Sequence, residues 1–204
     1  FETPVRQGET IYFSASTSEI NPATLQRQFT TEYNKRNERQ NFKDCLRNSA
    51  EQFFVRRDKK TEITAGFHWY GVSARNTFLS LPGLTLPIDD RKTFRSVCDT
   101  MVTRLHQGFF SDSGIDEPIR HFAADTSLWF IWALQRYCLY TNDCSFIWKN
   151  YSKAIKSIIR QYSEADQHNI RMLKNGLIQA GGPGAALTWM TSSVMGIPVT
   201  PRTG

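Results

Sequence analysis

The chain has 204 residues, of which 40% are hydrophobic and 13% aromatic. This composition excludes a disordered chain, and the length allows one sizeable core or one large piece of a bigger domain. The net charge of +6 could attract a polyanion. However, the charged runs at residues 33–39 and 56–60 are typical of solvated helix faces, and no helix-turn-helix, zinc-finger or RNA-recognition pattern accompanies them. We therefore expect no nucleic-acid partner.

The cysteines Cys45, Cys98, Cys138 and Cys144 form no CxxC pair and no metal-binding spacing. We expect free, mostly buried thiols, no metal and no cofactor, and a reducing compartment, the cytoplasm. No signal peptide and no apolar run long enough to span a bilayer is present, so we expect no membrane partner. Because the first residue is Phe1 and not Met, we expect a fragment or processed piece of a larger parent chain.

The first third of the chain predicts one short strand and two helices. Residues 11–16 are β-branched and aromatic, which indicates a strand. Asn21 and Pro22 offer an N-cap and a helix-opening proline for a helix that runs to about Lys35. A second helix is predicted over residues 42–55, with one apolar face formed by Phe42, Cys45, Leu46, Ala50, Phe53 and Phe54.

Three further helices are predicted. Residues 90–109 repeat the helical spacing with Phe94, Val97, Cys98, Met101, Val102 and Leu105, until Gly108 breaks the run. Residues 127–140 are apolar nearly all round, which predicts burial on most sides, with Trp129 and Trp132 in the core. Residues 144–162 are amphipathic, with Asp143 or Ser145 as the N-cap and an inward face of Phe146, Ile147, Tyr151, Ile155, Ile158 and Ile159.

Long loops that contain Gly and Pro join these helices, and long structured loops in a compact domain are usually functional. Three dense stretches stand out. Residues 65–86 combine aromatics with Arg75 and run into an apolar segment. Residues 125–131 open the apolar helix with an Asp, and residues 176–191 end in Leu-Thr-Trp-Met-Thr, followed by Val-Thr-Pro-Arg at 199–202.

Together these stretches resemble the glucosidase domain of glycogen debranching enzymes, the amylo-α-1,6-glucosidase family. The similar stretch in that family contains Gly-Arg-Asp-Thr, whose Arg-Asp pair grips hydroxyls of the terminal glucose. Here the pair is Arg75–Asn76, so a charged acceptor is replaced by a neutral one that forms hydrogen bonds about half as strong. The resemblance makes Trp69 and Tyr70 stacking candidates, and His68 replaces a proline of the family pattern.

The catalytic position also departs from the family. Enzymes of this kind need two carboxyl groups, one to protonate the leaving oxygen and one to activate water. The family reads Leu-Thr-Trp-Met-Asp, and its Asp is the general acid, whereas this chain has Thr191 after Trp189 and Met190. An alcohol is too weak an acid, and a missing acid typically costs about 10²–10⁴ in rate. The family's general base lies beyond Gly204.

Asp125 is the intact carboxylate of the pattern. The resemblance places it near the sugar, whereas its position before a helix equally predicts an N-cap. The resemblance implies a mainly α fold, part of an (α/α)6 toroid. Residues 1–20 would end a preceding β-rich domain and residues 21–204 would form the first half of the toroid.

The leading hypothesis is a debranching-glucosidase relative that recognises or hydrolyses α-1,6-branched α-glucans, with inversion and without a cofactor. Its substrate-binding residues would be Trp69, Tyr70, Arg75, Asn76, Asp125 and Trp189. The alternatives are a catalytically silent glucan-binding relative, engineered replacements, and a basic helical module that binds nucleic acid or protein. Another carboxylate could also have taken over the acid role, the candidates being Asp112, Asp116, Glu117 and Asp166.

Overall fold

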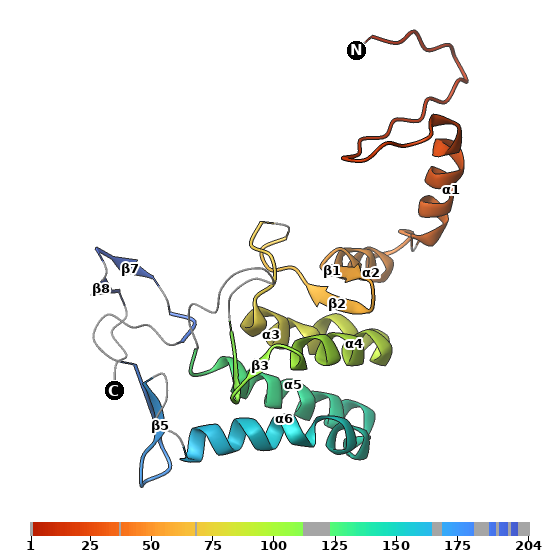
Figure 1. Cartoon of the computed structure of the whole chain (residues 1–204). Helices are drawn as coiled ribbons and strands as arrows, with labels where there is room; N and C mark the ends of the chain where they lie inside the picture. The colour runs from red at the N-terminus through yellow and green to blue at the C-terminus, as the bar shows by residue number, and fades with distance from the viewer. Residues whose placement is uncertain are drawn as a thin grey trace. The chain divides into compact units, whose positions relative to one another are not determined.

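The computed structural model describes residues 2–36, 38–67, 69–111, 123–164, 169–181, 188–190, 192–195 and 197–199. These residues are mainly helical, and the chain divides into two compact units, Phe1–Ser49 and Ala50–Gly204. Each unit is described by itself (Figure 1). Within the described residues, no helix is both long and apolar enough to cross a membrane.

The first unit contains the 3-10 helix η1 (Pro22–Thr24), α1 (Leu25–Lys35) and most of α2 (Phe42–Glu51). The predicted helix start is confirmed, since the side chain of Asn21 accepts a hydrogen bond from the Ala23 amide at 3.0 Å. The strand predicted over residues 11–16 does not form. A strand needs a partner, and within the described part of this unit no second extended segment pairs with it. Instead, the Tyr12 ring packs on Phe29 of α1, with centroids 5.4 Å apart.

The helix predicted over residues 42–55 ends at Glu51. Residues 54–63 form an antiparallel hairpin of β1 (Phe54–Arg57) and β2 (Lys60–Ile63), which turns at Asp58 with a φ of 53°. The charged run at 56–60 is therefore a hairpin and its turn, and not a helix face. The predicted apolar face of α2 is wrong at its beginning, because Phe42 and Leu46 are 78% and 54% exposed.

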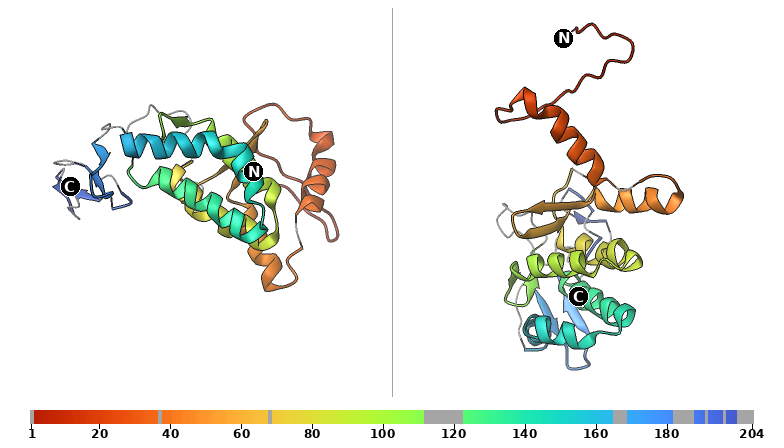
Figure 2. Two further views of the ribbon diagram at one scale, coloured as in Figure 1. Left: turned by 90° about the horizontal axis from the view of Figure 1, so that it is seen from below. Right: turned by 90° about the vertical axis from the view of Figure 1, so that its right-hand side faces the viewer.

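The second unit holds the core. Its remaining elements are α3 (Ala74–Thr85), η2 (Leu86–Ile88), α4 (Arg91–Val102), β3 (Leu105–His106), β4 (Phe109–Phe110), α5 (Thr126–Thr141), α6 (Cys144–Glu164), β5 (Ile170–Met172), β6 (Ile178–Ala180), β7 (Ser193–Val194) and β8 (Ile197–Pro198). The strands pair in sequence as two-stranded antiparallel hairpins. The two views of Figure 2 show α5 and α6 side by side, with α3 and α4 packed above α5 in Figure 1.

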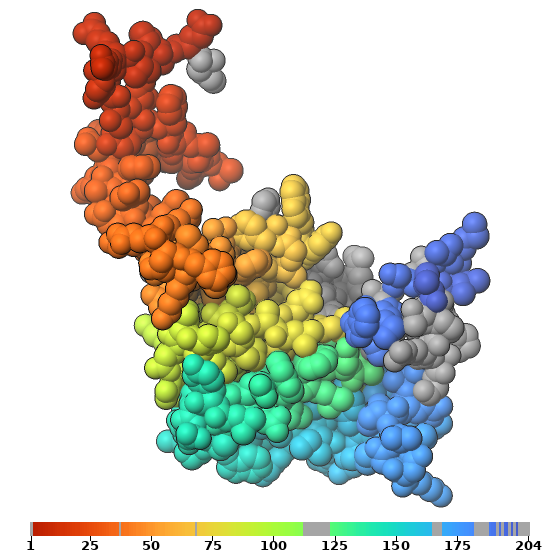
Figure 3. Space-filling view, turned by 180° about the vertical axis from the view of Figure 1, so that it is seen from behind, coloured from red at the N-terminus to blue at the C-terminus, as the bar shows by residue number. Residues whose placement is uncertain are grey.

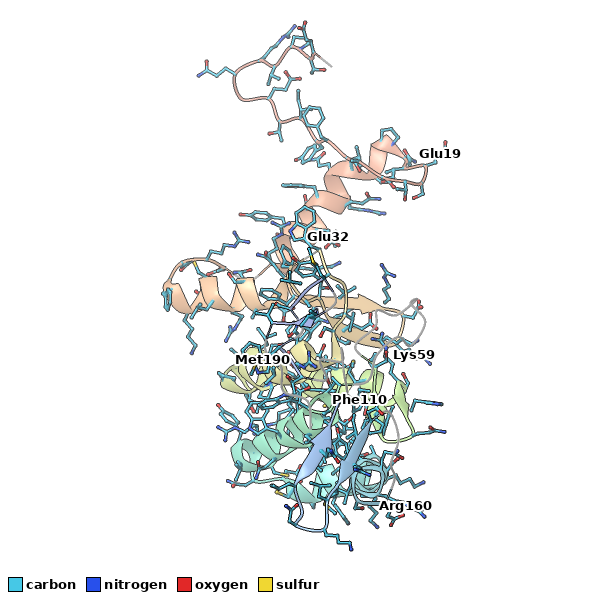
Figure 4. The ribbon with its side chains drawn as sticks, turned by 90° about the vertical axis from the view of Figure 1, so that its left-hand side faces the viewer. Glu19, Glu32, Lys59, Phe110, Arg160 and Met190 are labelled. Atoms are coloured by element: carbon cyan, nitrogen blue, oxygen red, sulfur yellow. The ribbon has the colours of Figure 1, made fainter. Side chains whose placement is uncertain are left out.

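Aromatic rings fill the space between these helices. The Phe78 ring of α3 lies 4.8 Å from Phe110 and 5.1 Å from Phe130 of α5, centroid to centroid, and all three side chains are buried. Figure 4 labels Phe110 in this interior, and Figure 3 shows the helices from α4 to α6 as one continuous packed surface. Each such buried ring contributes roughly 2–3 kcal/mol through the hydrophobic effect, so this cluster fixes how α3 meets α5.

The composition of residues 127–140 predicted that this helix is buried on most sides. In the structure, α5 is buried on one side, so that prediction is wrong. Leu128, Leu139 and Tyr140 are 42%, 63% and 53% exposed. Trp129 and Trp132 are half-buried at the edge of the core, since an isolated four-helix stack cannot enclose every face of one helix.

The start of α6 is as predicted. Asp143 caps it by accepting a hydrogen bond from the Phe146 amide at 3.1 Å, and this bond lowers the pKa of the Asp143 carboxyl. On the inward face Ile158 is buried, whereas Ile159 is 55% exposed and was wrongly assigned to it.

The four cysteines are free, as predicted. However, Cys45 and Cys144 are exposed, so the prediction of mostly buried thiols is wrong. Cys45 lies on the exposed face of α2. Cys144 is the first residue of α6, at a helix end where its side chain is exposed to solvent.

The helix predicted over residues 90–109 ends at Val102, and β3 begins at Leu105, so the prediction that Gly108 ends the helix is wrong. Gly108 instead forms the turn between β3 and β4, with a φ of +80°. A Cβ at this position would lie 2.6 Å from the Cβ of Gln161 and 2.8 Å from the carbonyl oxygen of Ser157, both on α6. The glycine therefore lets the hairpin lie directly against the α6 backbone.

We predict that Gly108→Ala lowers the free energy of unfolding by about 2–4 kcal/mol, because it adds a clash with backbone to the strain of a positive φ. Gly176→Ala is the matched control, since Gly176 has a φ of +82° and nothing within 4 Å of its Cβ position. It should cost only about 1 kcal/mol. Urea denaturation of both variants measures the difference, and equal losses would contradict the proposed clash.

Candidate functional site

The aromatic stretch forms a tight loop between β2 and α3. Thr64 bridges to Val72, the Ala65 amide donates to the Gly71 carbonyl at 2.6 Å, and the Tyr70 amide donates back to the Ala65 carbonyl at 3.3 Å. Gly66 has a φ of +54°, and a Cβ there would lie 2.1 Å from the Tyr70 ring. This loop conformation therefore requires glycine at position 66, because the Tyr70 ring occupies the space that a Cβ would take.

This loop presents two aromatic side chains to solvent. Trp69 is 77% exposed and Tyr70 is 80% exposed. Exposed aromatic rings are the groups on which sugar C–H faces pack. His68, which lies between them and Phe67, is outside the described residues.

Directly after the loop, α3 begins. The Ser73 hydroxyl accepts a hydrogen bond from the Asn76 amide at 3.3 Å, which caps the first turn. The cap holds Arg75 in that turn, with Ala74 buried beside it. The Arg75 side chain therefore extends from the first turn of α3, where the loop and the helix meet.

The side chain of Arg75 forms a forked ion pair with Asp125. Its Nε lies 3.1 Å from both carboxylate oxygens, and its Nη2 lies 2.9 Å from Oδ1. The two side chains are only 11% and 21% exposed. Forked pairs between guanidinium and carboxylate are among the stronger and more directional polar contacts in proteins. The pair joins two of the motifs that sequence analysis singled out, 50 residues apart.

Trp129 completes this arrangement. Its indole N–H donates to Oδ2 of Asp125 at 3.3 Å, from one turn further along α5. Sequence analysis missed this role, although a spacing of four residues on a helix is the signal that could have revealed it. The N-cap hypothesis for Asp125 is confirmed for the position and wrong for the side chain. Asp125 occupies the N-cap position of α5, but its side chain makes no capping hydrogen bond, because its oxygens accept from Arg75 and Trp129 instead.

The beginning of α5 is held from two other sides. The Ser127 hydroxyl accepts from the Phe110 amide at 3.1 Å, and the Tyr162 hydroxyl of α6 donates to the Ala124 carbonyl at 2.7 Å. Burial raises the pKa of Tyr162, so its hydroxyl remains a donor at neutral pH. These bonds fix the backbone on which Asp125 sits, which is the kind of support that a binding group requires.

Asn76 does not join the ion pair but lines a neighbouring groove. The groove has a volume of about 380 Å³, and its lining includes Phe53, Thr64, Asn76, Leu79, Ser80 and Leu84. It is mainly apolar, with hydroxyl and amide groups at its edge, as in many small-ligand pockets. The Ser80 hydroxyl donates to the main-chain carbonyl oxygen of Asn76 at 2.7 Å, so this hydroxyl already has a hydrogen-bond partner within α3.

The structure does not bring all predicted site residues together. Trp189 is 67% exposed in the short segment 188–190, and no contact between it and the Arg75–Asp125 pair is described. Thr191 lies outside the described residues, and so do the relocated-acid candidates Asp112, Asp116, Glu117 and Asp166. Among the described residues, no group of three or more His, Cys, Asp or Glu side chains could hold a metal ion.

The described residues thus form a mainly helical unit with an ion pair between the beginnings of α3 and α5 and two exposed rings in the loop before α3. Comparison with protein families identifies the class of this domain: residues 48–204 match the amylo-alpha-1,6-glucosidase family. The chain belongs to this family and is a glycoside hydrolase domain related to glycogen debranching. No curated protein and no solved structure matches the chain.

We predict that Asp125→Asn lowers the free energy of unfolding by about 2–4 kcal/mol, because it leaves the poorly exposed Arg75 without its charged partner. Glu164→Gln is the control, since it breaks the Arg160–Glu164 pair of α6, whose side chains are 78% and 62% exposed. The control should show no measurable change. Chemical denaturation of both variants tests this, and an unchanged stability of Asp125→Asn would mean that the ion pair does not hold α3 to α5.

Proposed function

We propose that this domain recognises the terminal glucose of an α-1,6 branch on an α-glucan, and that it hydrolyses the branch slowly or not at all. The observation that carries the proposal is the Arg75–Asp125 ion pair, in which two family motifs meet. Sugar hydroxyls are bound best by fixed charged donors and acceptors, and the remaining oxygen lone pairs of Asp125 can accept from them.

In this proposal, Trp69 and Tyr70 supply the apolar surface on which a pyranose ring stacks, and Trp189 contributes a further ring. Their exposure supports the assignment, because a solvent-exposed ring surface is accessible to a ligand. Asn76 would accept a hydroxyl in place of the family's carboxylate. Its hydrogen bond is neutral, so we expect weaker binding than in relatives with Asp at this position.

The absence of efficient hydrolysis follows from residue chemistry. The family pattern requires a proton donor at position 191, and Thr191 cannot serve as one. Asp125 is a poor substitute, because both of its oxygens accept hydrogen bonds from Arg75 and Trp129. The second candidate, hydrolysis by a relocated carboxylate, would need that group near the leaving oxygen.

We also propose that α3–α6 form part of an (α/α)6 toroid and that the chain acts in the cytoplasm. The short link between α5 and α6, with Asn142 at a φ of 54°, supports the first point, since helical hairpins with such turns are the repeating unit of helical toroids. The free thiols support the second. The exposed apolar side of α5 would then face further helices.

The proposed lack of hydrolysis can be tested by glucose release from phosphorylase-limit glycogen. The measurement uses the full-length parent protein, because the resemblance places the general base beyond Gly204. The unaltered parent should release little glucose, whereas Asn76→Asp combined with Thr191→Asp should raise the rate by about 10²-fold or more, as expected for a restored general acid. Release by the unaltered protein at ordinary enzyme rates would show that another carboxylate serves as the acid. Binding of branched oligosaccharide must be measured in parallel, so that a silent protein is distinguished from one that has lost its ligand.

Binding itself is tested by replacing the two exposed rings. Trp69→Ala with Tyr70→Ala should weaken binding of a branched maltooligosaccharide about tenfold or more in calorimetry, equivalent to roughly 1.4 kcal/mol. Trp148→Ala is the matched control, because Trp148 is 56% exposed on α6. It should leave the affinity within about twofold. Equal effects of the two changes would contradict the proposed stacking surface.

A further inference from the structure

A second concave surface lies in the same unit, between the β1–β2 hairpin and α4. This basic groove has a volume of about 750 Å³, and its lining includes Lys59, Lys60, Arg91, Lys92, Arg95 and Asp99. It shares no lining residue with the Asn76 groove or with the Arg75–Asp125 pair. Figure 4 labels Lys59 at the turn of the hairpin.

The walls of the basic groove are fixed to each other. The Thr61 amide donates to the Thr100 hydroxyl at 3.0 Å, the Thr61 and Ser96 hydroxyls are 2.7 Å apart, and Arg104 pairs with the buried Glu62. These bonds attach β2 to the side of α4. Lys60, the neighbour of Thr61, is therefore held beside α4 and does not depend on a free loop for its position.

The basic groove carries more positively charged side chains than there are carboxylates to balance them. Arg91 pairs with Asp89 at 2.6 Å, and Arg95 lies 3.8 Å from Asp143. Asp99 accepts a hydrogen bond from Tyr151 at 2.8 Å. Lys59, Lys60 and Lys92, in contrast, have no ion pair among the described residues. Three ammonium groups thus converge on one groove without a carboxylate for each.

Arg95 adds a rigid donor to these lysines. Its Nε donates to the Tyr137 hydroxyl at 2.9 Å, and its guanidinium lies 3.7 Å from the centroid of the Phe146 ring. A guanidinium fixed in this way loses little side-chain entropy when an oxyanion arrives. A fixed guanidinium in a groove that lysine side chains also line is a suitable donor set for a compact, doubly charged oxyanion.

We infer that the basic groove binds a phosphate group, either as free phosphate or as a phosphomonoester on a sugar. The groove is large enough to admit such a ligand. Asp89, shortly before α4, and Asp143, directly before α6, would repel a long polyanion that extends past the groove. Asp99 lines the groove itself, where its carboxylate accepts a hydrogen bond from the Tyr151 hydroxyl. This inference does not depend on the proposed glucan binding.

Calorimetric titration of the full chain with inorganic phosphate and with glucose 6-phosphate tests the inference, with glucose as the uncharged control. Both phosphates should bind, with an affinity that falls as salt is raised, and glucose should not compete with them. Tighter binding of the sugar phosphate would identify a phosphomonoester as the ligand, and equal affinities would identify the phosphate alone. The absence of binding by either phosphate would overturn the inference.

The matched variants are Lys59→Gln/Lys60→Gln/Lys92→Gln in the basic groove and Lys149→Gln/Lys153→Gln/Lys174→Gln elsewhere on the same unit. All six lysines are exposed, so both variants should fold and both lose the same charge. The groove variant should bind phosphate at least tenfold more weakly, and the control within twofold of the unaltered chain. Equal weakening would overturn the inference, because it would show attraction by net charge alone. Preferential binding of a short oligonucleotide that is lost in the groove variant would also overturn it, in favour of a nucleic-acid surface.

Discussion

The ion pair between Arg75 and Asp125 is the constraint on which the arrangement of the second unit depends. Two charged groups with little exposure lose most of their hydration, and only a forked geometry with further hydrogen bonds offsets that cost. The pair forms only if the first turn of α3 faces Asp125, the residue directly before α5. The packing of Phe78 against Phe110 and Phe130, and the bonds to Ser127 and Ala124, all fix that register.

Sequence patterns predicted the helices well where one local signal was decisive. Asn21 with Pro22 and Asp143 act at the helix starts where capping chemistry places them. The errors occurred where periodicity continued past a turn. Residues 52–55 kept the apolar spacing of α2, yet Asp58 adopts a left-handed conformation that closes a hairpin. Periodicity records which side chains are apolar, whereas the turn depends on backbone pairing with β2, a segment that the pattern treats separately.

The candidate site was also predicted in part, but from resemblance to a family and not from helical patterns. Resemblance to a family identified Arg75 and Asp125 as single positions, but it did not reveal that they bind each other across 50 residues. Contacts between distant segments follow from packing, which no local pattern encodes. Asp125 occupies the predicted N-cap position but makes no capping hydrogen bond, because the local preference for capping competes with a guanidinium and the charged partner forms the stronger bond. Trp129 shows the opposite case, since its contact with Asp125 is local and readable from the spacing.

The neutral residue at position 76 acts apart from this ion pair. Asn76 directly follows Arg75 in the first turn of α3, and consecutive helix residues do not face each other. Asn76 lines the groove with Leu79 and Ser80, whereas Arg75 donates to both oxygens of Asp125. Under the proposed function, the Asp125 carboxylate accepts sugar hydroxyls through its remaining lone pairs and supplies no proton to a leaving group. The neutral residue at position 76 would weaken binding of the sugar, whereas Thr191 at the acid position would slow cleavage, so the two replacements act on different steps, one on binding and one on chemistry.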